Sequence, residues 1–549
     1  MKCKEVVAVL SAACCLTGCA GGEQRADDAA APDSPNYGGT VVVAYLAEAS
    51  SMNHLTSVDE NSLELQDFVL FMTLIQYDAQ LNPVPYLAER WDTSSADAGL
   101  ALTFYLRDDV KWHDGMPTTA RDVKFTFDRI KNPAAAYPRA SLFTNYDSAS
   151  VSDNFVITFY LKRHAGFMDP WRTVAPMPEH ILGEVAVGDL PQHPFGTTSP
   201  VGNGPFRFIE HRARDRWVFE ANPDFPQPLG GRPFVDRLVY RVIEEPTTRL
   251  GELLAGEVDV YVSVDPSQIA EIDAHPAARV TSFPSRSYTF INWNSQRPLF
   301  RDARVRRALT LGIDRQRLVE AVRYGLGTVA NGPVPPFHWA YHAHLNALPY
   351  DPDSARALLD AAGWADRDGD GVREREADKA SFELRTNPNP ARQDIMTLVQ
   401  ADLAKIGVQV RTFVQEAQSL RMDITSKERR FDAFVLGWSS DFVLDDRALF
   451  ACSQRDGPFQ WASYCNRRVD ALLDRITSLA DRSAALPLWY EYQEIIQQDQ
   501  PYTFLYYLEQ ANGVNRRVQN VRMDIRGNLI NAKDWWILPA TGRAAKEKT

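Results

Sequence analysis

The sequence is poor in the residues that most metal centres, redox sites and thiol enzymes use. It has 6 cysteines and 10 histidines in 549 residues. No histidine is followed by glutamate, so the HExxH pattern of a zinc hydrolase is absent, and neither a Gly-Lys pair nor a GxSxG segment occurs. These absences exclude a phosphate-binding loop and a nucleophile elbow. A secreted hydrolase built from distant residues stays open as an alternative, because triads need no local motif.

Long apolar runs and an excess of basic charge are also missing. No stretch reaches the roughly 18 residues of a membrane-spanning helix. The net charge is −12, from 59 basic and 71 acidic residues, whereas nucleic-acid binding needs clustered Lys and Arg. We therefore expect no nucleic-acid partner. The chain is 45% hydrophobic and 11% aromatic, which is typical of a globular protein with enough rings to line a large pocket.

The first residues are typical of a secretory signal peptide. Lys2 and Lys4 precede an apolar stretch at 6–16, which is too short to span a bilayer. The segment Leu-Thr-Gly-Cys that ends at Cys19 resembles the lipobox of bacterial lipoproteins. We predict a lipoprotein signal peptide at 1–18, lipidation of Cys19 and a flexible tether at 19–37, so that the protein is anchored to the membrane. The alternative is a plain secretory signal with an incidental Cys19.

Two cysteines remain beyond this leader, Cys452 and Cys465. Outside the cytosol two spare thiols tend to oxidise together, so we predict a Cys452–Cys465 disulfide. Two buried free thiols are the alternative, because spacing alone does not bring the two Cα atoms close enough.

Local patterns predict helices and strands in alternation. Thr119 begins a capping box ahead of an amphipathic helix over 120–131. Asp302 and Asp314 can each cap a helix within 302–323. Further elements are predicted as strands at 431–438 and 502–508 and helices at 467–476 and 482–498. The alternation favours an α/β chain with mixed sheets.

Seven segments resemble one family, in order, over roughly residues 40–510. They are PYLAERWDTSS (85–95), LTFYLRDDVKWHDGMPTTARDVKFTFDRI (102–130), VGNGPFRF (201–208), FVDRLVYRVIEEPTTRLGELLAGEVDV (234–260), DARVRRALTLGIDRQRLVEAV (302–322), DPDSARALLDAAGW (351–364) and YCNRRVDALLD (464–474). The family is bacterial extracellular solute-binding protein family 5, the large substrate-binding proteins of peptide ABC importers.

The resemblance implies an α/β fold of two lobes, the type II periplasmic-binding-protein fold of the large peptide-binding class, with an extra N-terminal subdomain. Lobe I would comprise 38–80, the extra subdomain 81–195, and 196–288. Lobe II would comprise 289–508, with 509–549 as the lobe I return and C-terminal tail. Closure of two lobes around a ligand is hinge motion.

The resemblance also implies a role and partners. The protein would be a monomeric, lipid-anchored binding component without cofactor or enzymatic activity. It would capture di- or oligopeptides at the periplasmic or extracellular face and hand them to an ABC permease with its ATPase subunits. A different cargo, such as a sugar oligomer, a metal chelate or an antibiotic, is the alternative within the same class.

The segment DAFVLGWSSDFVLDD (432–446) resembles the family strand that grips peptide cargo. The resemblance implies that Asp441 holds the ligand's ammonium, since desolvating an ammonium is costly unless a carboxylate meets it. It assigns Trp438, Ser439 and Ser440 to the same site. From the other lobe, Asp59 and Glu60 are expected to face the cleft. The alternative for Asp441 is a structural role at the strand end.

Three other motifs are interpreted structurally. In KWHDG (111–115) adjacent His and Asp point to opposite faces of an extended segment, so a turn is favoured over catalysis. DRDGDG (366–371) resembles the start of a calcium-binding loop, but Ala377 stands where the last carboxylate ligand belongs, so an acidic turn is favoured. His338, His342 and His344 lie in a Pro-rich loop and are interpreted as surface residues. We predict no metal site.

Overall fold

The computed structural model describes residues 35–539, apart from 58, 97–98, 136, 139, 144–145, 163–169, 443 and 480. The predicted signal peptide, Cys19 and nearly all of the predicted tether lie outside the described residues, as does the tail from 540. All described elements belong to one compact unit, Asn36–Thr549. Within the described part, no helix is both long and apolar enough to cross a bilayer.

A single 11-stranded mixed sheet runs through this unit, in the order β17-β16-β18-β12-β19-β11-β1-β10-β9-β8, with β13 paired to β19. Its strands are β1 (Thr40–Tyr45), β8 (Phe206–Arg212), β9 (Arg216–Ala221), β10 (Arg237–Val242), β11 (Val260–Tyr261), β12 (Ala278–Trp293), β13 (Gly327–Val329), β16 (Ser381–Thr386), β17 (Gln409–Val414), β18 (Ala433–Ser439) and β19 (Tyr502–Asn515). We call the part built on β1 and β8–β11 lobe I, and the part built on β13 and β16–β18 lobe II. The α/β, two-lobed fold is confirmed.

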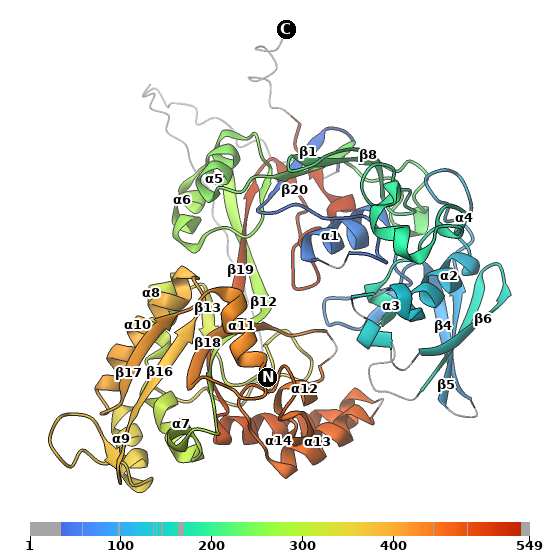
Figure 1. Cartoon of the computed structure of the whole chain (residues 1–549). Coiled ribbons are helices and arrows are strands. Elements are labelled where there is room, and N and C mark those ends of the chain that lie inside the picture. Colours follow the sequence, from blue (N-terminus) through green and yellow to red (C-terminus); the bar gives the residue numbers. More distant parts are fainter. Residues whose placement is uncertain are drawn as a thin grey trace, which may run out of the picture. The chain divides into compact units, whose positions relative to one another are not determined.

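The long antiparallel strands β12 and β19 join the two lobes (Figure 1). At one end they pair with each other beside β11 of lobe I, and at the other they pair beside β18 of lobe II. Their ladder is interrupted between Pro284 and Tyr288. The predicted strand 502–508 is therefore too short, because β19 continues to Asn515 through polar residues that pair with β12. The predicted lobe boundaries at 288 and 508 fall inside these two strands, and the exact boundaries stay a prediction.

Lobe I has one large hydrophobic core, to which a second sheet contributes, and smaller hydrophobic clusters beside it. That sheet has the order β4-β5-β7-β6 and is covered by α2, whose Val123 and Phe127 are fully buried beside Phe104 and Phe159. The further elements of this part are α1 (Glu60–Leu65), the π-helix η1 (Gln66–Leu70), β2 (Ile75–Tyr77), β3 (Pro83–Pro85), β4 (Ala88–Ala96), β5 (Gly99–Leu106), α2 (Ala120–Lys131), β6 (Tyr146–Asp153), β7 (Val156–Leu161), α3 (Pro170–Thr173), α4 (Glu179–Leu182), α5 (Pro246–Ala255), α6 (Ile269–Ala274), β20 (Val518–Gln519) and β21 (Trp536–Ile537). Residues 518–535 return to this core from the C-terminal end of the chain.

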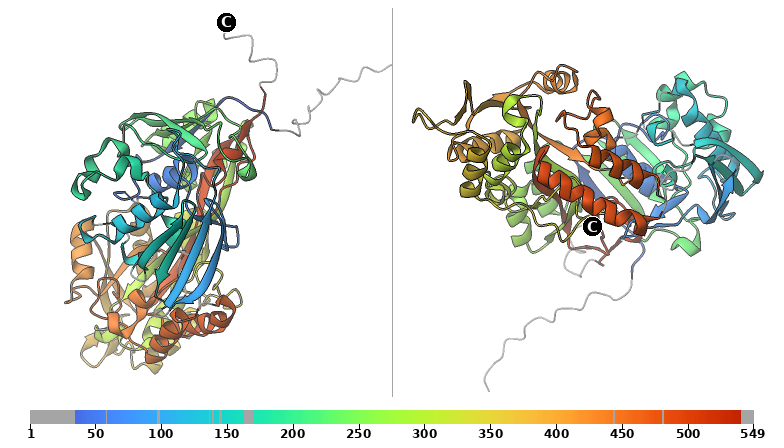
Figure 2. Two further views of the ribbon diagram at one scale, coloured as in Figure 1. Left: turned by 90° about the vertical axis from the view of Figure 1, so that its right-hand side faces the viewer. Right: turned by 90° about the horizontal axis from the view of Figure 1, so that it is seen from below.

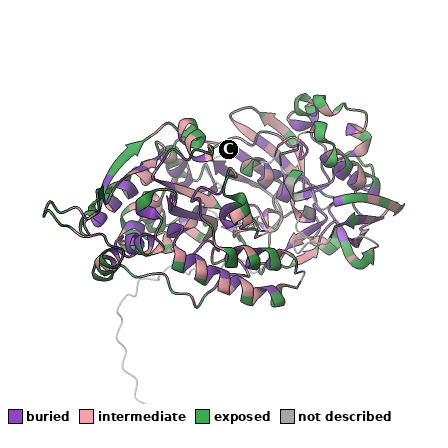
Figure 3. Ribbon diagram, turned by 60° about the horizontal axis from the view of Figure 1, so that its bottom comes forward, coloured by how far each residue is buried: buried purple, intermediate pink, exposed green. Residues whose placement is uncertain are grey.

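Lobe II has two cores, one on each face of its sheet. Alternate residues of β12 point to opposite faces: Ile291 and Trp293 belong to one core, Tyr288 and Phe290 to the other. The covering elements are α7 (Ala303–Leu311), α8 (Arg315–Arg323), α9 (Pro352–Ala361), β14 (Glu374–Arg375), β15 (Asp378–Lys379), α10 (Pro390–Ala404), α11 (Ala417–Thr425), α12 (Arg447–Phe450), α13 (Arg467–Thr477) and α14 (Arg482–Asp499). Figure 2 shows α13 and α14 packed together. Figure 3 shows that the helices expose their outer faces and that the inner strands are largely buried, whereas edge strands such as β17 are mostly exposed.

The predicted helix starts are confirmed. Thr119 and Asp122 form a reciprocal capping box at α2. The Asp302 and Asp314 side chains accept backbone N–H groups at the starts of α7 and α8. The sequence predicts these features because a cap depends on neighbours only a few residues away.

Cys452 and Cys465 are joined by a disulfide, with their Cα atoms 4.5 Å apart. Cys452 begins a short 3-10 turn after α12, and Cys465 precedes α13. Closing a loop of this length stabilises the fold by roughly 3 kcal/mol in the chain-entropy account.

Candidate ligand-binding cavity

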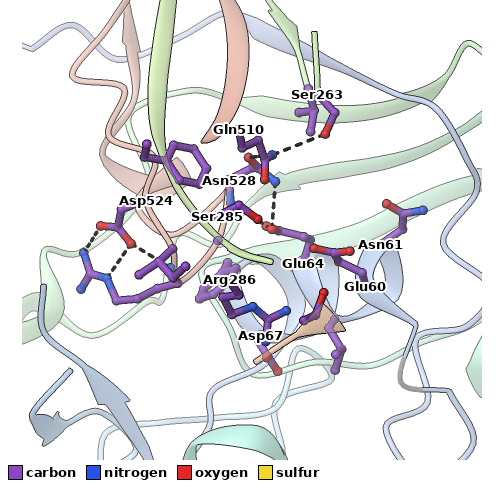
Figure 4. Close-up of a pocket in the computed structure, with 18 of the residues that line it drawn as sticks. Glu60, Asn61, Glu64, Asp67, Ser263, Ser285, Arg286, Gln510, Asp524 and Asn528 are labelled. Atoms are coloured by element: carbon purple, nitrogen blue, oxygen red, sulfur yellow. Dashed lines mark hydrogen bonds and ion pairs between the residues drawn. The ribbon is translucent and has the colours of Figure 1, made fainter. Parts of the chain in front are cut away.

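A cavity of about 600 Å³ lies where the two lobes meet the connecting strands (Figure 4). Its volume is within the range of about 300–1,000 Å³ that is usual for small-molecule sites. Lobe I lines it with α1, η1 and the segment 524–528, while lobe II lines it with the end of β18. The interrupted part of β12, at Ser285–Ser287, supplies the wall between them. The site is thus assembled from residues almost 500 positions apart.

The lobe II wall carries a carboxylate that makes no hydrogen bond or ion pair with the described residues. Asp441 follows β18, is exposed and lines the cavity. Among the described residues, no side chain or backbone group forms a hydrogen bond or ion pair with its carboxylate. Next to it, the Ser439 hydroxyl lies 2.6 Å from that of Ser287, so the two small side chains tie β18 to β12 and leave room beside the backbone.

The lobe I wall carries two more carboxylates, which differ in how far they are exposed to solvent. Glu60 is exposed on α1, whereas Glu64, one turn later, is buried and accepts hydrogen bonds from the backbone N–H groups of Asn528 and Leu529 at 2.9 and 3.0 Å. Burial raises the pKa of Glu64 to about 7, and the hydrogen bonds only partly oppose this rise. The same Asn528 accepts from Gln510 of β19 at 2.9 Å, which links α1 to a connecting strand.

The carboxylate of Asp59, which we predict to face the cleft together with Glu60, accepts its hydrogen bonds from the protein itself. Its side chain accepts the Ser62 backbone N–H at 2.9 Å and so caps α1. The hydroxyls of Ser50, Ser57 and Ser62 also donate to it, at 2.5, 2.6 and 2.6 Å. Burial opposes ionisation of Asp59, but these hydrogen bonds outweigh it and lower its pKa. Asp59 is not among the residues that line the cavity.

Trp438 and Ser440 are likewise absent from the cavity lining. The half-buried Trp438 ring packs against Phe459 and Trp461 of lobe II, with centroid distances of 5.8 and 5.7 Å. Ser440 is buried, and its backbone N–H donates to the Arg286 carbonyl at 3.0 Å. Of the residues predicted from sequence, the structure brings Asp441, Ser439 and Glu60 to one cavity. Their ligand-binding roles stay a prediction.

Sequence reasoning missed an aromatic and cationic cluster on the same wall. Phe442 directly follows Asp441, and the guanidinium groups of Arg172 and Arg286 lie 4.4 and 5.2 Å from its ring centroid. Tyr77 of lobe I lies 6.0 Å from the same ring. The only local signal was the aromatic residue after Asp441, because the two arginines come from distant segments.

The predicted surface location of two histidines is wrong. His338 and His342 are buried, and only His344 of the three is exposed. His338 packs beneath the cavity wall, with Nε2 3.2 Å from the Phe442 carbonyl, and burial lowers its pKa to about 4. His342 stacks on Tyr490 of α14 at 4.1 Å. The Pro-rich loop is packed onto lobe II, which its composition did not indicate.

The side chains of the other two motifs, KWHDG (111–115) and the acidic turn at 366–371, lie close to groups of the protein itself. The His113 ring faces the Gly204 carbonyl at 3.1 Å, while Asp114 pairs with His180 at 2.7 Å, so the adjacent pair does not act as one unit. In the acidic turn, the ligand atoms of Asp366, Asp368, Asp370 and Glu374 lie within 4.8 Å of one another. Lys379 forms an ion pair with Asp370.

Comparison with known proteins agrees with this architecture. Residues 82–458 match the family described as bacterial extracellular solute-binding proteins, family 5 Middle. The chain belongs to this family. It is 31% identical, over 528 residues, to the oligopeptide-binding protein AppA of Bacillus subtilis (strain 168), which covers 95% of this chain and 96% of AppA. Proteins of this extracellular family are periplasmic or extracellular, and the relatives are binding proteins rather than enzymes.

Solved structures show the same fold for this family 5 protein. AppA from Bacillus subtilis in complex with a nonapeptide has a TM-score of 0.73 at 31% identity, covering 92% of this chain and 100% of AppA. Another relative is named for a different ligand: heme-binding protein A of Haemophilus influenzae is 29% identical over 440 residues, covering 76% of this chain and 78% of that protein.

Proposed function

We propose that this family 5 protein is the lipid-anchored binding component of an ABC importer for di- or oligopeptides. It captures cargo between two closing lobes, as a monomer, and delivers it to the membrane permease and its ATPase subunits. The lipobox-like segment ending at Cys19 supports the anchor. The observation that carries the peptide assignment is Asp441, a carboxylate at the cavity wall that has no partner among the described residues.

The chemistry of the lining supports a peptide over a metal-bound cargo. An ammonium that enters a closing cavity loses its water and needs a carboxylate, which Asp441 supplies with Glu60 facing from lobe I. Ser439 is small enough for the backbone of a ligand to approach β18. The described residues that line the cavity include no histidine or cysteine, the side chains that most often ligate transition metals.

Thermal unfolding of a soluble chain beginning at residue 20 tests this proposal. Each di- to hexapeptide would be added with a free and with an acetylated N-terminus, and hemin would serve as the contrasting cargo. A ligand at one hundred times its dissociation constant adds about 2.7 kcal/mol to the unfolding free energy. We expect stabilisation by free but not by acetylated peptides. Stabilisation by both forms would remove the ammonium role of Asp441, and none by any peptide would overturn the peptide assignment.

A further inference from the structure

His338 is a buried histidine next to the segment of the cavity wall that carries Asp441. Only 3% of the residue is exposed, in the loop between β13 and α9. Its backbone N–H donates to the Pro335 carbonyl at 3.0 Å, and its own carbonyl accepts the Tyr341 N–H at 2.9 Å. Ala340 of the same loop is fully buried in a core of lobe II. The backbone at His338 is therefore fixed independently of its side chain.

The hydrogen bonds of the imidazole ring determine its tautomer. Nδ1 accepts the Ala340 backbone N–H at 3.1 Å, so this nitrogen carries no proton. The proton of the neutral ring is therefore on Nε2, which donates to the Phe442 carbonyl at 3.2 Å. Burial lowers the pKa of His338 to about 4. At neutral pH the ring thus donates a hydrogen bond without adding a positive charge beside the place proposed for the ammonium.

Asp441 lies between two backbone groups that other segments hold. The N–H of Ser440, before it, donates to the Arg286 carbonyl of β12 at 3.0 Å. The carbonyl of Phe442, after it, accepts the Nε2–H of His338. Because no group of the described residues bonds to the Asp441 carboxylate, its direction depends on the backbone on either side. The two hydrogen bonds therefore orient Asp441 from both sides.

The loop that carries His338 has further contacts, which do not depend on the imidazole ring. Phe337 meets the Phe442 ring edge-on, with the centroids 6.2 Å apart. On the other side of His338, the Arg482 guanidinium carbon lies 5.4 Å from the centroid of Trp339. A substitution that removes only the Nε2–H of His338 therefore leaves the loop held by its neighbours.

We propose that His338 is a positioning residue for cargo binding: its Nε2–H holds the Phe442 carbonyl and thereby directs the Asp441 carboxylate at the ammonium of the peptide. The inference rests on the proposed peptide-binding function and adds to it a residue that does not touch the cargo, since His338 is not among the residues that line the cavity. A carboxylate already held in one direction loses less conformational freedom when the ammonium arrives, which favours binding.

Two substitutions separate the two hydrogen bonds of the ring. In His338→Asn the amide oxygen can replace Nδ1 as the acceptor for Ala340, but the side chain is too short to reach Phe442. In His338→Gln the longer side chain can present an amide N–H to the Phe442 carbonyl. His342→Asn, which alters another buried histidine of the same loop, is the matched control.

Calorimetric titration of these variants tests the proposal. The ligand is the tightest binder among the di- to hexapeptides with a free N-terminus. Each substitution is measured alone and combined with Asp441→Asn, after the melting temperature has verified folding. We expect His338→Asn to weaken binding by about fivefold or more, which corresponds to one hydrogen bond. His338→Gln and His342→Asn should keep the affinity within about twofold.

The combination with Asp441→Asn separates positioning from a general effect on the fold. The loss caused by His338→Asn should vanish in that background, because a residue that acts through another has no effect once the other is removed. An unchanged affinity in His338→Asn, an equal loss in His338→Gln, or a loss that persists beside Asp441→Asn would each overturn the positioning role while peptide binding stands. Absence of binding by every peptide to the unsubstituted chain would overturn the proposed function and this inference with it.

Discussion

At the residue scale, two aspartates of the same predicted site have opposite surroundings. Asp59 receives three serine hydroxyls and a backbone N–H, so its charge is already compensated. Asp441, which follows β18 rather than capping a helix, has no such donor among the described residues. The difference is one of availability: only a carboxylate that the fold does not use can exchange its water for a ligand's ammonium.

Replacing Asp441 by Asn should therefore weaken free-amine peptides selectively. The shape is retained, but the ammonium enters the closed cavity without a counter-charge, which costs about 3 kcal/mol, or roughly a hundredfold in affinity. Acetylated peptides should be affected far less. Calorimetric titration measures both, with Ser439→Ala as a neighbouring control. Equal loss for free and acetylated peptides would show that Asp441 acts on the fold rather than on the ammonium.

Glu64 makes stability depend on pH. Because its folded-state pKa is raised from 4.5 to about 7 by burial, the folded protein holds this proton more tightly than the unfolded chain. The stabilisation is fully present below pH 4.5 and is lost as the pH rises through about 7. The loss amounts to at most about 3 kcal/mol.

Urea unfolding at pH 5 and pH 8 measures this contribution. We expect Glu64→Gln to flatten the pH dependence between these values, while the exposed Glu60→Gln on the same helix keeps it. Asp446, whose pKa burial also raises to about 7, adds to the pH dependence of every variant and does not alter the difference between them. An unchanged slope in Glu64→Gln would contradict the prediction.

At the element scale, buried arginines tie α8 to β19 and α7 to the C-terminal end of α14. Arg315 donates to the carbonyls of Ala330 and Phe504 at 2.9 and 2.8 Å and also to Leu348. Arg306 donates to the carbonyls of Asp499 and Phe300 at 2.6 and 2.7 Å. Arg306 lies within α7 and Arg315 begins α8, in a stretch for which the sequence predicts only two capped helices. Each guanidinium replaces several lost water contacts by carbonyl groups from different segments.

Arg315→Lys should destabilise the protein although the charge is kept. An ammonium cannot reach three carbonyls arranged around a planar fork, so at least one stays unsatisfied in a buried place. We expect a loss of about 2–4 kcal/mol in the free energy of unfolding by urea. Arg307→Lys on α7 is the control, because no hydrogen bond is recorded for its side chain among the described residues. A loss no larger than that of the control would show that the fork is dispensable.

The sequence could predict those elements whose signals come from neighbouring residues. Caps at Thr119, Asp302 and Asp314 depend on adjacent residues, and the motif around Asp441 is a contiguous strand end. By contrast, β19 beyond residue 508 is polar, and only its distant partner β12 makes it a strand. Arg286 escaped prediction for a similar reason, since an arginine among serines has no local signal of facing a cavity.

At the scale of the whole folded unit, contacts around Phe442 connect lobe I to lobe II. Arg172 and Tyr77 of lobe I meet the Phe442 ring of lobe II. On the same side, Arg482 of α14 donates to the Leu81 carbonyl at 3.1 Å. Hinge closure needs such contacts, because a two-state equilibrium shifts only by what one state gains over the other.

Phe442→Ala should move this equilibrium toward the open state. Losing the ring removes its contacts with Arg172 and Tyr77, worth about 1 kcal/mol, or several-fold in apparent peptide affinity. Small-angle scattering without peptide should give a larger radius of gyration, which peptide reverses. Phe459→Ala, an exposed ring of lobe II outside the cavity lining, is the control. An unchanged radius with unchanged affinity would contradict the prediction.

The interruption in β12 has a consequence for how such a protein diverges. Ser285, Arg286 and Ser287 are at once part of the cavity wall and the place where a connecting strand is irregular. A substitution that adapts this wall to another cargo therefore also alters the flexibility of the joint. Selectivity and the speed of ligand release would be inherited together, so that a variant adapted to a new ligand would also release that ligand at a different rate.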